Sequence, residues 1–288
     1  MKDNIDSGTA FELNERFSTT RRVIKSDVPY VGKSGGVAEG GLRTRGFSKR
    51  SAPCQPLISV ITVVYNGEAH LEQAIQSVIN QTYDNVEYII VDGGSAEVTL
   101  QVIKKYDSAI DYWISEADSG VYDAMNKGVK LATGDYVLFL GSDDALFDVF
   151  HELVGSLVEK AHSYYGSVVL SEDNQLYDGR FYALKLFLQN IPHQAILYSR
   201  AIFDEYSFDV KYIAVADYAL NLKLFSDKRY GFQHIPFLIA SYDNESGLSS
   251  TVVDAAFSSD KPAIIKKHYS GLYNMIYLVV RSVFKRKK

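Results

Sequence analysis

Between residues 57 and 140, runs of consecutive apolar residues alternate with runs whose apolar residues recur every three or four positions. The consecutive runs contain many β-branched residues, which is typical of the buried strands of a parallel sheet, whereas the periodic runs are typical of amphipathic helices. The predicted strands are 57–65, 86–91, 112–114 and 136–140, and the predicted helices are 71 to about 82, about 98–106 and about 121–132. This alternation predicts an α/β fold of the Rossmann-like kind, with a mostly parallel sheet flanked by helices.

Beyond residue 150 the alternation becomes irregular. We expect an antiparallel pair of strands at 164–170 and 175–177, a helix over 217–225 and a late strand over 237–242. Before residue 56 no sustained apolar period occurs, and glycine pairs and basic residues predict an extended, partly flexible arm. The predicted organisation is therefore an arm (1–55), a regular half (56–150), an irregular half (151–255) and a basic amphipathic helical tail (256–288).

Polar or glycine-rich clusters follow all four predicted strands of the regular half. In open α/β sheets, ligands bind beyond the carboxyl ends of the strands, so we expect these clusters to share one site. Ser142, Asp143 and Asp144 follow the last strand, where their oxygens can bind Mg²⁺ or Mn²⁺ and through it a diphosphate. The alternative is an acidic turn that caps the next helix, because Asp is a favoured N-cap residue.

Two further clusters leave a functional and a structural interpretation open. Asp92 is followed by two glycines, so its carboxylate can accept a hydrogen bond from a ribose or a base, or can simply close a turn. Asp123, Asn126 and Lys127 share one helix face, where they can meet a phosphate or a sugar hydroxyl, or form a solvated surface.

Composition and motif searches narrow the classes of function. The net charge of −5 gives no general attraction to nucleic acid, so no nucleic-acid partner is expected. Neither the GxGxxG fingerprint of dinucleotide-binding enzymes nor the GxxxxGK[ST] loop of NTPases occurs. The single cysteine, Cys54, excludes an internal disulfide, and the charged N-terminus does not resemble a signal peptide, so we expect a cytoplasmic protein.

The tail is apolar over 276–280 and then strongly basic. Such a segment can lie in a membrane interface, with its lysines near anionic lipids. The alternative is a docking helix with a solvated basic end. We favour peripheral contact with the inner face of the cell membrane.

The ordered set of motifs resembles family 2 glycosyltransferases, which are inverting enzymes of the GT-A fold that often serve bacterial polysaccharide assembly. The resemblance is dense over about 57–150 and looser to about 250. The motifs that carry it are 59–66, 77–83, 87–95, 118–128, 132–136 and 142–144, followed by His193-Gln194 and Ala216-Asp217-Tyr218.

The resemblance implies a hexosyltransferase-type enzyme that moves a sugar from a nucleotide-diphosphate sugar to a hydroxyl of a glycan or lipid-linked acceptor. It assigns residues 56–150 to the donor and 151–255 to the acceptor. The implied donor-binding residues are Val63, Tyr65, Asp92, Asp118 and Asp143, to which the helix-face analysis adds Asn126 and Lys127. The implied metal ligands for Mn²⁺ or Mg²⁺ are Asp144 and Asp143. The implied catalytic base is Asp217, and His193 and Gln194 are expected to contact the diphosphate or the acceptor.

Two other functions remain open at this point. A sugar nucleotidyltransferase also uses carboxylates beyond strands, but its glycine-rich basic loop is not found at the exit of the first strand, Asn66-Gly67-Glu68. A non-catalytic, nucleotide-sugar-binding subunit of a glycan assembly complex is favoured only by Ala216, which stands where the family usually has Glu.

Overall fold

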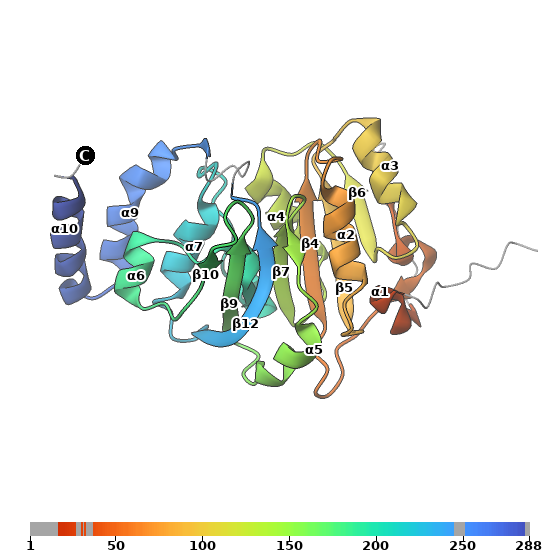
Figure 1. The fold of residues 1–288 in the computed structure, drawn as a ribbon, viewed down its shortest axis with the longest axis horizontal. Helices are drawn as coiled ribbons and strands as arrows, with labels where there is room; N and C mark the ends of the chain where they lie inside the picture. Colours follow the sequence, from red (N-terminus) through yellow and green to blue (C-terminus); the bar gives the residue numbers. More distant parts are fainter. Residues whose placement is uncertain (1–16, 27–29, 31, 33–36, 245–250, 286–288) are drawn as a thin grey trace, which may run out of the picture.

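A mixed sheet runs through the centre of the molecule, with helices packed around it (Figure 1). The structure is a computed structural model that describes residues 17–26, 30, 32, 37–244 and 251–285. The main sheet of this described part has the strand order β2-β6-β5-β4-β7-β11-β9-β12-β8, and β10 pairs with β9. The predicted mostly parallel α/β fold is therefore confirmed.

The strands are β1 (Ile24–Lys25), β2 (Ala38–Gly40), β3 (Phe47–Ser48), β4 (Ile58–Val64), β5 (Val86–Asp92), β6 (Tyr112–Ser115), β7 (Tyr136–Gly141), β8 (Ala145–Leu146), β9 (Ser163–Leu170), β10 (Leu176–Tyr177), β11 (Ile196–Ser199) and β12 (Phe232–Tyr242). The α-helices are α1 (Ser18–Arg21), α2 (Leu71–Ile79), α3 (Glu97–Lys105), α4 (Val121–Leu131), α5 (Phe150–Leu153), α6 (Ala183–Leu188), α7 (Ala216–Leu224), α9 (Ala255–His268) and α10 (Gly271–Lys285).

The four strands predicted in the regular half lie side by side and parallel, in the order β6-β5-β4-β7. All seven residues of β4 and of β5 are buried, which explains why these strands are mostly apolar. The register pairs Val64 with Asp92, Val63 with Gly141, and Asp92 with Ser115. The carboxyl ends of all four strands consequently meet at one edge of the sheet.

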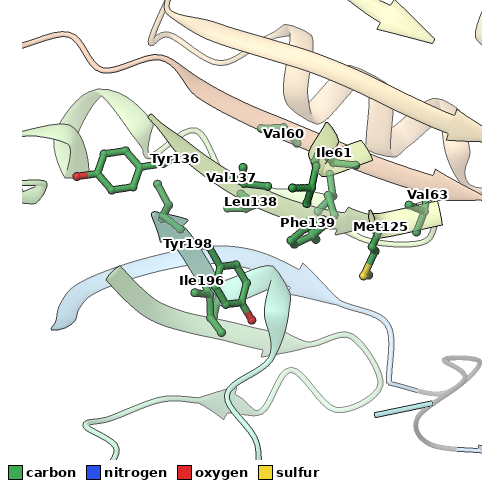
Figure 2. Packing of buried hydrophobic residues seen from close by; sticks show 14 of the residues in the cluster. Val60, Ile61, Val63, Met125, Tyr136, Val137, Leu138, Phe139, Ile196 and Tyr198 are labelled. Carbon is green, nitrogen blue, oxygen red and sulfur yellow. The ribbon is translucent and has the colours of Figure 1, made fainter. Parts of the chain in front are cut away.

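The helices pack on this sheet through their apolar faces. α4 lies especially close, because a Cβ added to Gly128 would lie 2.5 Å from Cγ2 of Ile61 on β4. Glycine at this position therefore lets the helix backbone approach the strand. Figure 2 shows the resulting core between the two halves, where Val137 and Phe139 of β7 lie near Ile61 of β4 and Tyr198 of β11.

The irregular half extends the same sheet. The predicted antiparallel pair is confirmed as β9 and β10, the predicted helix as α7, and the late strand as β12, which begins five residues earlier than predicted. β11 was not predicted, and it pairs antiparallel with both β7 and β9. It therefore joins the two halves into one continuous sheet.

The part of the predicted arm that the structure describes packs against the sheet. β2 pairs antiparallel with β6 at the sheet edge, which is a more ordered arrangement than the extended, partly flexible arm we expected. Nearby, Lys49 is buried, and its Nζ donates a hydrogen bond of 2.7 Å to Oδ2 of Asp111. Residues 1–16 of the arm lie outside the described residues.

The tail forms α9 and α10 at the end of the molecule opposite α3 (Figure 1). Phe187 of α6 packs against Tyr269 and Tyr277, with ring centroids 4.8 and 5.6 Å apart. One face of α10 is therefore docked on the protein. Within the described residues, no helix combines the length and the apolar character that crossing a bilayer requires.

Candidate active site

A cavity of about 1090 Å³ opens at the carboxyl edge of the parallel strands. Its walls come from both halves of the chain, and they include the loops that follow β4, β5, β6 and β7. The predicted site residues that line it are Val63, Tyr65, Asp118, Asp143, Asp144, His193, Gln194 and Asp217. Asp92, Asn126 and Lys127 do not line it.

Asp144 is held rigidly in the wall of this cavity, where its side chain is only 3% exposed. Its Oδ2 accepts hydrogen bonds from Nε2 of Gln194 at 2.7 Å and from the backbone N–H of Gly141 at 3.0 Å. Its Oδ1 accepts from the backbone N–H of Asp243 at 2.9 Å. Burial, and then the neighbouring charge of Asp143, raise the pKa of Asp144 to about 6.

Asp143 and Asp144 converge on the same small space. A Cβ added to Gly141 would lie 2.6 Å from Oδ1 of Asp143 and 2.6 Å from Oδ2 of Asp144, so the glycine leaves room for both carboxylates. Burial raises the pKa of Asp143, and the charge of Asp243 adds to this effect. Asp143 disfavours the ionisation of Asp144, and two carboxylates placed in this way are suitable ligands for a divalent cation.

The carboxylates of Asp143 and Asp144 fit a cation that takes its remaining ligands from outside the protein side chains. Among the described residues, no group of three or more His, Cys, Asp or Glu side chains is arranged to hold a metal ion alone. Mg²⁺ is commonly bound by one or two carboxylates together with phosphate oxygens and water. Asp143 and Asp144 match that pattern.

Asp92 lies beneath the cavity wall, fully buried at the end of β5. Its Oδ2 accepts from Oγ of Ser115 at 2.6 Å and from the backbone N–H groups of Gly94 and Ser95 at 3.1 and 3.0 Å. Its Oδ1 is buried and has no hydrogen-bond partner in the structure. The geometry favours the structural interpretation of Asp92, as the group that closes the turn after β5, and its contact with a base stays a prediction.

The turn closed by Asp92 brings Asp118 into the cavity. A Cβ added to Gly93 would lie 2.5 Å from Oδ2 of Asp118, so these two segments touch. Oδ1 of Asp118 accepts from the backbone N–H of Gly120 at 2.8 Å, just before α4 begins. Val63 and Tyr65 lie on the same side of the cavity at the end of β4, and the Tyr65 side chain is 69% exposed.

Asn126 and Lys127 bind other parts of the chain. The Asn126 amide forms two hydrogen bonds with the backbone of Phe208, donating to its carbonyl at 2.9 Å and accepting from its N–H at 3.0 Å. Nζ of Lys127 donates to the carbonyl of Ala117 at 2.9 Å and lies 3.4 Å from Oδ2 of Asp123. These partners favour a structural role for both residues, and their predicted contacts with the donor stay predictions.

Asp217 enters the cavity from α7 and is almost completely buried. The hydroxyl of Tyr122 lies 2.9 Å from its Oδ1, and Nδ2 of Asn190 donates to its Oδ2 at 2.7 Å. Nδ1 of His193 lies 3.4 Å from the same Oδ2. The carboxylate that the resemblance assigns as the base thus shares one cavity with the acidic pair.

The segment from Asn190 to Gln194 connects the two sets of carboxylates. Gln194 contacts Asp144, whereas Asn190 and His193 contact Asp217. A 3-10 helix, η3 (His193–Ala195), brings the two neighbouring side chains to their different partners. The motif His193-Gln194 therefore contacts both the acidic pair and Asp217.

Sequence reasoning missed Tyr122, Asn190 and the loop 242–244, all of which line the cavity. For the loop, a usable signal was present. Asp243 directly follows a predicted strand, as Asp92 does. No comparable signal marks Tyr122 or Asn190, because their roles depend on Asp217, which is distant in the sequence.

Comparison with known proteins agrees with this arrangement. The family described as Glycosyl transferase family 2 matches residues 59–212. A "PGL/p-HBAD biosynthesis glycosyltransferase" of Mycobacterium bovis is 35% identical over 216 residues, which cover 72% of this chain and 84% of that protein.

Solved structures share the fold at lower sequence identity. S. aureus TarS 1-349 in complex with UDP-GlcNAc has a TM-score of 0.60 and 18% identity, covering 77% of this chain and 70% of that one. The mannosyltransferase PcManGT from Pyrobaculum calidifontis, in complex with GDP-Man and Mn²⁺, has a TM-score of 0.50 and 15% identity, covering 74% and 63%. From the family match and the mycobacterial relative, the chain belongs to glycosyltransferase family 2 and is an enzyme.

Proposed function

We propose that this enzyme transfers a sugar, with inversion, from a nucleotide-diphosphate sugar to a hydroxyl of a glycan or lipid-linked acceptor. The observation that carries the proposal is the shared cavity, which is lined by the paired carboxylates Asp143 and Asp144 and by the separate carboxylate Asp217. Inverting transfer needs these two functions together, because one end of the site stabilises the leaving group while the other accepts a proton.

The donor would bind over the end of β4. Val63 and Tyr65 offer apolar and aromatic surface to a nucleotide base, and Asp118 offers a carboxylate to the sugar part of the nucleotide. The complexes of TarS with UDP-GlcNAc and of PcManGT with GDP-Man support this class of donor. Asp143 and Asp144 would hold Mn²⁺ or Mg²⁺, which when bound neutralises charge on the diphosphate.

The reaction would be a single displacement. The acceptor oxygen forms a bond to C1 of the sugar while the bond from C1 to the diphosphate oxygen breaks, and the nucleoside diphosphate leaves with that electron pair. Asp217 takes the proton of the attacking hydroxyl. Nδ2 of Asn190 donates to Oδ2 of this carboxylate, and the Tyr122 hydroxyl, which also lies 3.0 Å from the carbonyl oxygen of Ala214, contacts its Oδ1.

Slow hydrolysis of the donor provides a test that needs no known acceptor. A panel of UDP- and GDP-sugars with Mn²⁺ would be followed by ¹H NMR, which detects the configuration of the released sugar before it mutarotates. We expect one donor to be hydrolysed with inversion, and Asp144→Ala to abolish this activity. Asp204→Ala is the matched control, because Asp204 is exposed in another part of the chain. Retention of configuration, or full activity in Asp144→Ala, would contradict the proposal.

We also propose that α10 holds the enzyme on the anionic inner face of the cell membrane, where a lipid-linked acceptor would lie. Leu272, Met275 and Val279 follow one another at helical spacing and are exposed by 62, 59 and 59%. The sequence then becomes basic over 285–288, so apolar contact and attraction to anionic lipid act together.

Sedimentation with vesicles tests this membrane contact. We expect the protein to bind vesicles that contain phosphatidylserine more strongly than vesicles of phosphatidylcholine alone. Replacing Leu272, Met275 and Val279 together by Ser should reduce binding, whereas Val158→Ser, at an exposed site outside α10, should not. Equal binding by a chain that ends at Ser270 would contradict this part of the proposal.

A further inference from the structure

A line of hydrogen-bonded side chains leads from the buried sheet to Asp217. The hydroxyl of Tyr198, on β11, donates to Oδ1 of Asn221 at 2.8 Å. Nδ2 of Asn221, on α7, donates to Oδ1 of Asn190 at 2.9 Å. Nδ2 of Asn190 then donates to Oδ2 of Asp217 at 2.7 Å. The side-chain amides of Asn221 and Asn190 thus each accept one hydrogen bond and donate another, and the series of hydrogen bonds ends at the carboxylate of Asp217.

A backbone carbonyl determines which way the two asparagine amides face in this series of hydrogen bonds. Nδ2 of Asn221 also lies 3.2 Å from the carbonyl oxygen of Ile191, which can only accept. The nitrogen of Asn221 must therefore face Ile191 and Asn190, and its oxygen must face Tyr198. Oδ1 of Asn190 then faces Asn221, which leaves only its N–H group to face Asp217.

We propose that Asn190 and Asn221 are positioning residues of the transfer reaction, which present a directed N–H donor to Asp217 and so hold its carboxylate in the orientation needed to accept a proton. The proposal rests on the role of Asp217 stated above. A reversed Asn190 amide would place a carbonyl oxygen against the carboxylate, which favours its protonated form and removes the base.

The surroundings support this role. Tyr198 and Asn221 are fully buried and do not line the cavity, so they act on a ligand only through Asn190 and Asp217. Burial and the charge of Asp217 raise the pKa of Tyr198, and they raise that of Tyr122 as well, so both hydroxyls stay protonated. Tyr122 and Asn190 together contact both oxygens of Asp217 and so define the plane of its carboxylate.

The pH dependence of turnover separates positioning from simple structural support. Asn221→Asp removes the N–H group that orients Asn190, and Asn190→Asp places a second carboxylate beside Asp217. The probe would be the donor sugar hydrolysed in the panel described above, with Mn²⁺. We expect the acidic limb of the kcat profile to move to higher pH by about one unit or more in each variant, because a neighbouring acceptor or negative charge disfavours the ionised base.

Two variants keep the test decisive. Asn221 is fully buried, so Asn221→Asp can fail to fold, whereas Asn190 is only partly buried and tolerates a charge better. Tyr88→Phe is the matched control, because it removes a buried hydroxyl that bonds Thr62 at 3.1 Å, and it should leave the profile in place. If Asn190→Asp lowers the rate equally at every pH and leaves the acidic limb of the kcat profile in place, the proposed positioning role is overturned.

The experiments distinguish failure of the proposed positioning role from failure of the proposed base role of Asp217. If Asp217→Asn retains full turnover, Asp217 is not the base and the proposed function loses its catalytic residue. If Asp217→Asn is inactive while the acidic limb of both asparagine variants stays unmoved, Asp217 remains the proposed base, and only the positioning role of Asn190 and Asn221 is refuted.

Discussion

Nε2 of Gln194 donates a hydrogen bond of 2.7 Å to Oδ2 of Asp144, which lies fifty residues earlier in the chain. Both side chains are almost completely buried, so this contact is shielded from water. It connects the segment that also carries His193 to the carboxylate pair after β7. The irregular half of the molecule therefore shapes the predicted metal site.

Removing this donor should weaken both stability and donor binding. Hydrogen bonds to charged groups typically contribute about 1.5–3 kcal/mol. We expect Gln194→Ala to lower the free energy of unfolding by about 2 kcal/mol, and to reduce the thermal shift that Mn²⁺ and nucleotide sugar produce together. Urea unfolding and thermal shift measure the two effects. Gln189→Ala, at an exposed position of the same segment, should change neither.

Binding of the divalent cation should depend on pH near neutrality. The pKa of Asp144 is raised to about 6 by burial and by Asp143, and a cation binds the ionised form. Because the folded-state pKa lies above the unfolded value, the protonated carboxyl stabilises the metal-free fold at low pH, and this contribution is lost as the pH rises through about 6.

Binding of the cation should have the opposite pH dependence, because the cation binds the ionised carboxylate. We expect the apparent affinity for Mn²⁺ to rise about tenfold per pH unit below pH 6 and to level above it, because binding then requires no loss of a proton. Calorimetric titration with Mn²⁺ between pH 5 and 8 measures this. An affinity that stays constant over the range would show that Asp144 does not control cation binding.

Replacing the proposed base should separate chemistry from binding. General-base catalysis typically contributes 10²–10⁴-fold in rate. We expect Asp217→Asn to lower kcat by about that factor while the thermal shift with donor and Mn²⁺ stays close to that of the unchanged protein. Asp204→Asn serves as the control, since its carboxylate pairs with Arg200 in an exposed helical turn. Loss of the donor-induced shift in Asp217→Asn would indicate a binding role instead.

Asp92 should matter first for stability. Its Oδ2 accepts three hydrogen bonds in a fully buried turn, so Asp92→Ala leaves Ser115 and two backbone N–H groups without their acceptor. We expect a loss of about 3 kcal/mol or more in the free energy of unfolding, measured with urea. Ser115→Ala should cost less, about 1 kcal/mol, and the double variant should show strong coupling. Unchanged stability in Asp92→Ala would instead favour the predicted role of Asp92 in binding the nucleotide base of the donor.

The sequence determined the regular half of the fold and the location of the ligand-binding edge. The apolar runs of β4 and β5 and the helical period of α2 are local properties, which persist wherever the segment is placed. Parallel strands must point the same way, so the polar residues after them collect at one edge. For this reason Asp118, Asp143 and Asp144 could be expected in one cavity before any coordinates were known.

Only the tertiary structure decided which polar side chains face that cavity. Strand register opposes Asp92 to Ser115, and the two side chains bond to each other beneath the turn. Asn126 contacts Phe208, and Tyr122 contacts Asp217, across 82 and 95 residues. Such long-range pairings arise from how α4 packs against segments of the irregular half, and a local pattern carries no record of them. The part of the cavity around Asp217, including the orientation of its carboxylate, is therefore a product of packing between segments distant in the chain.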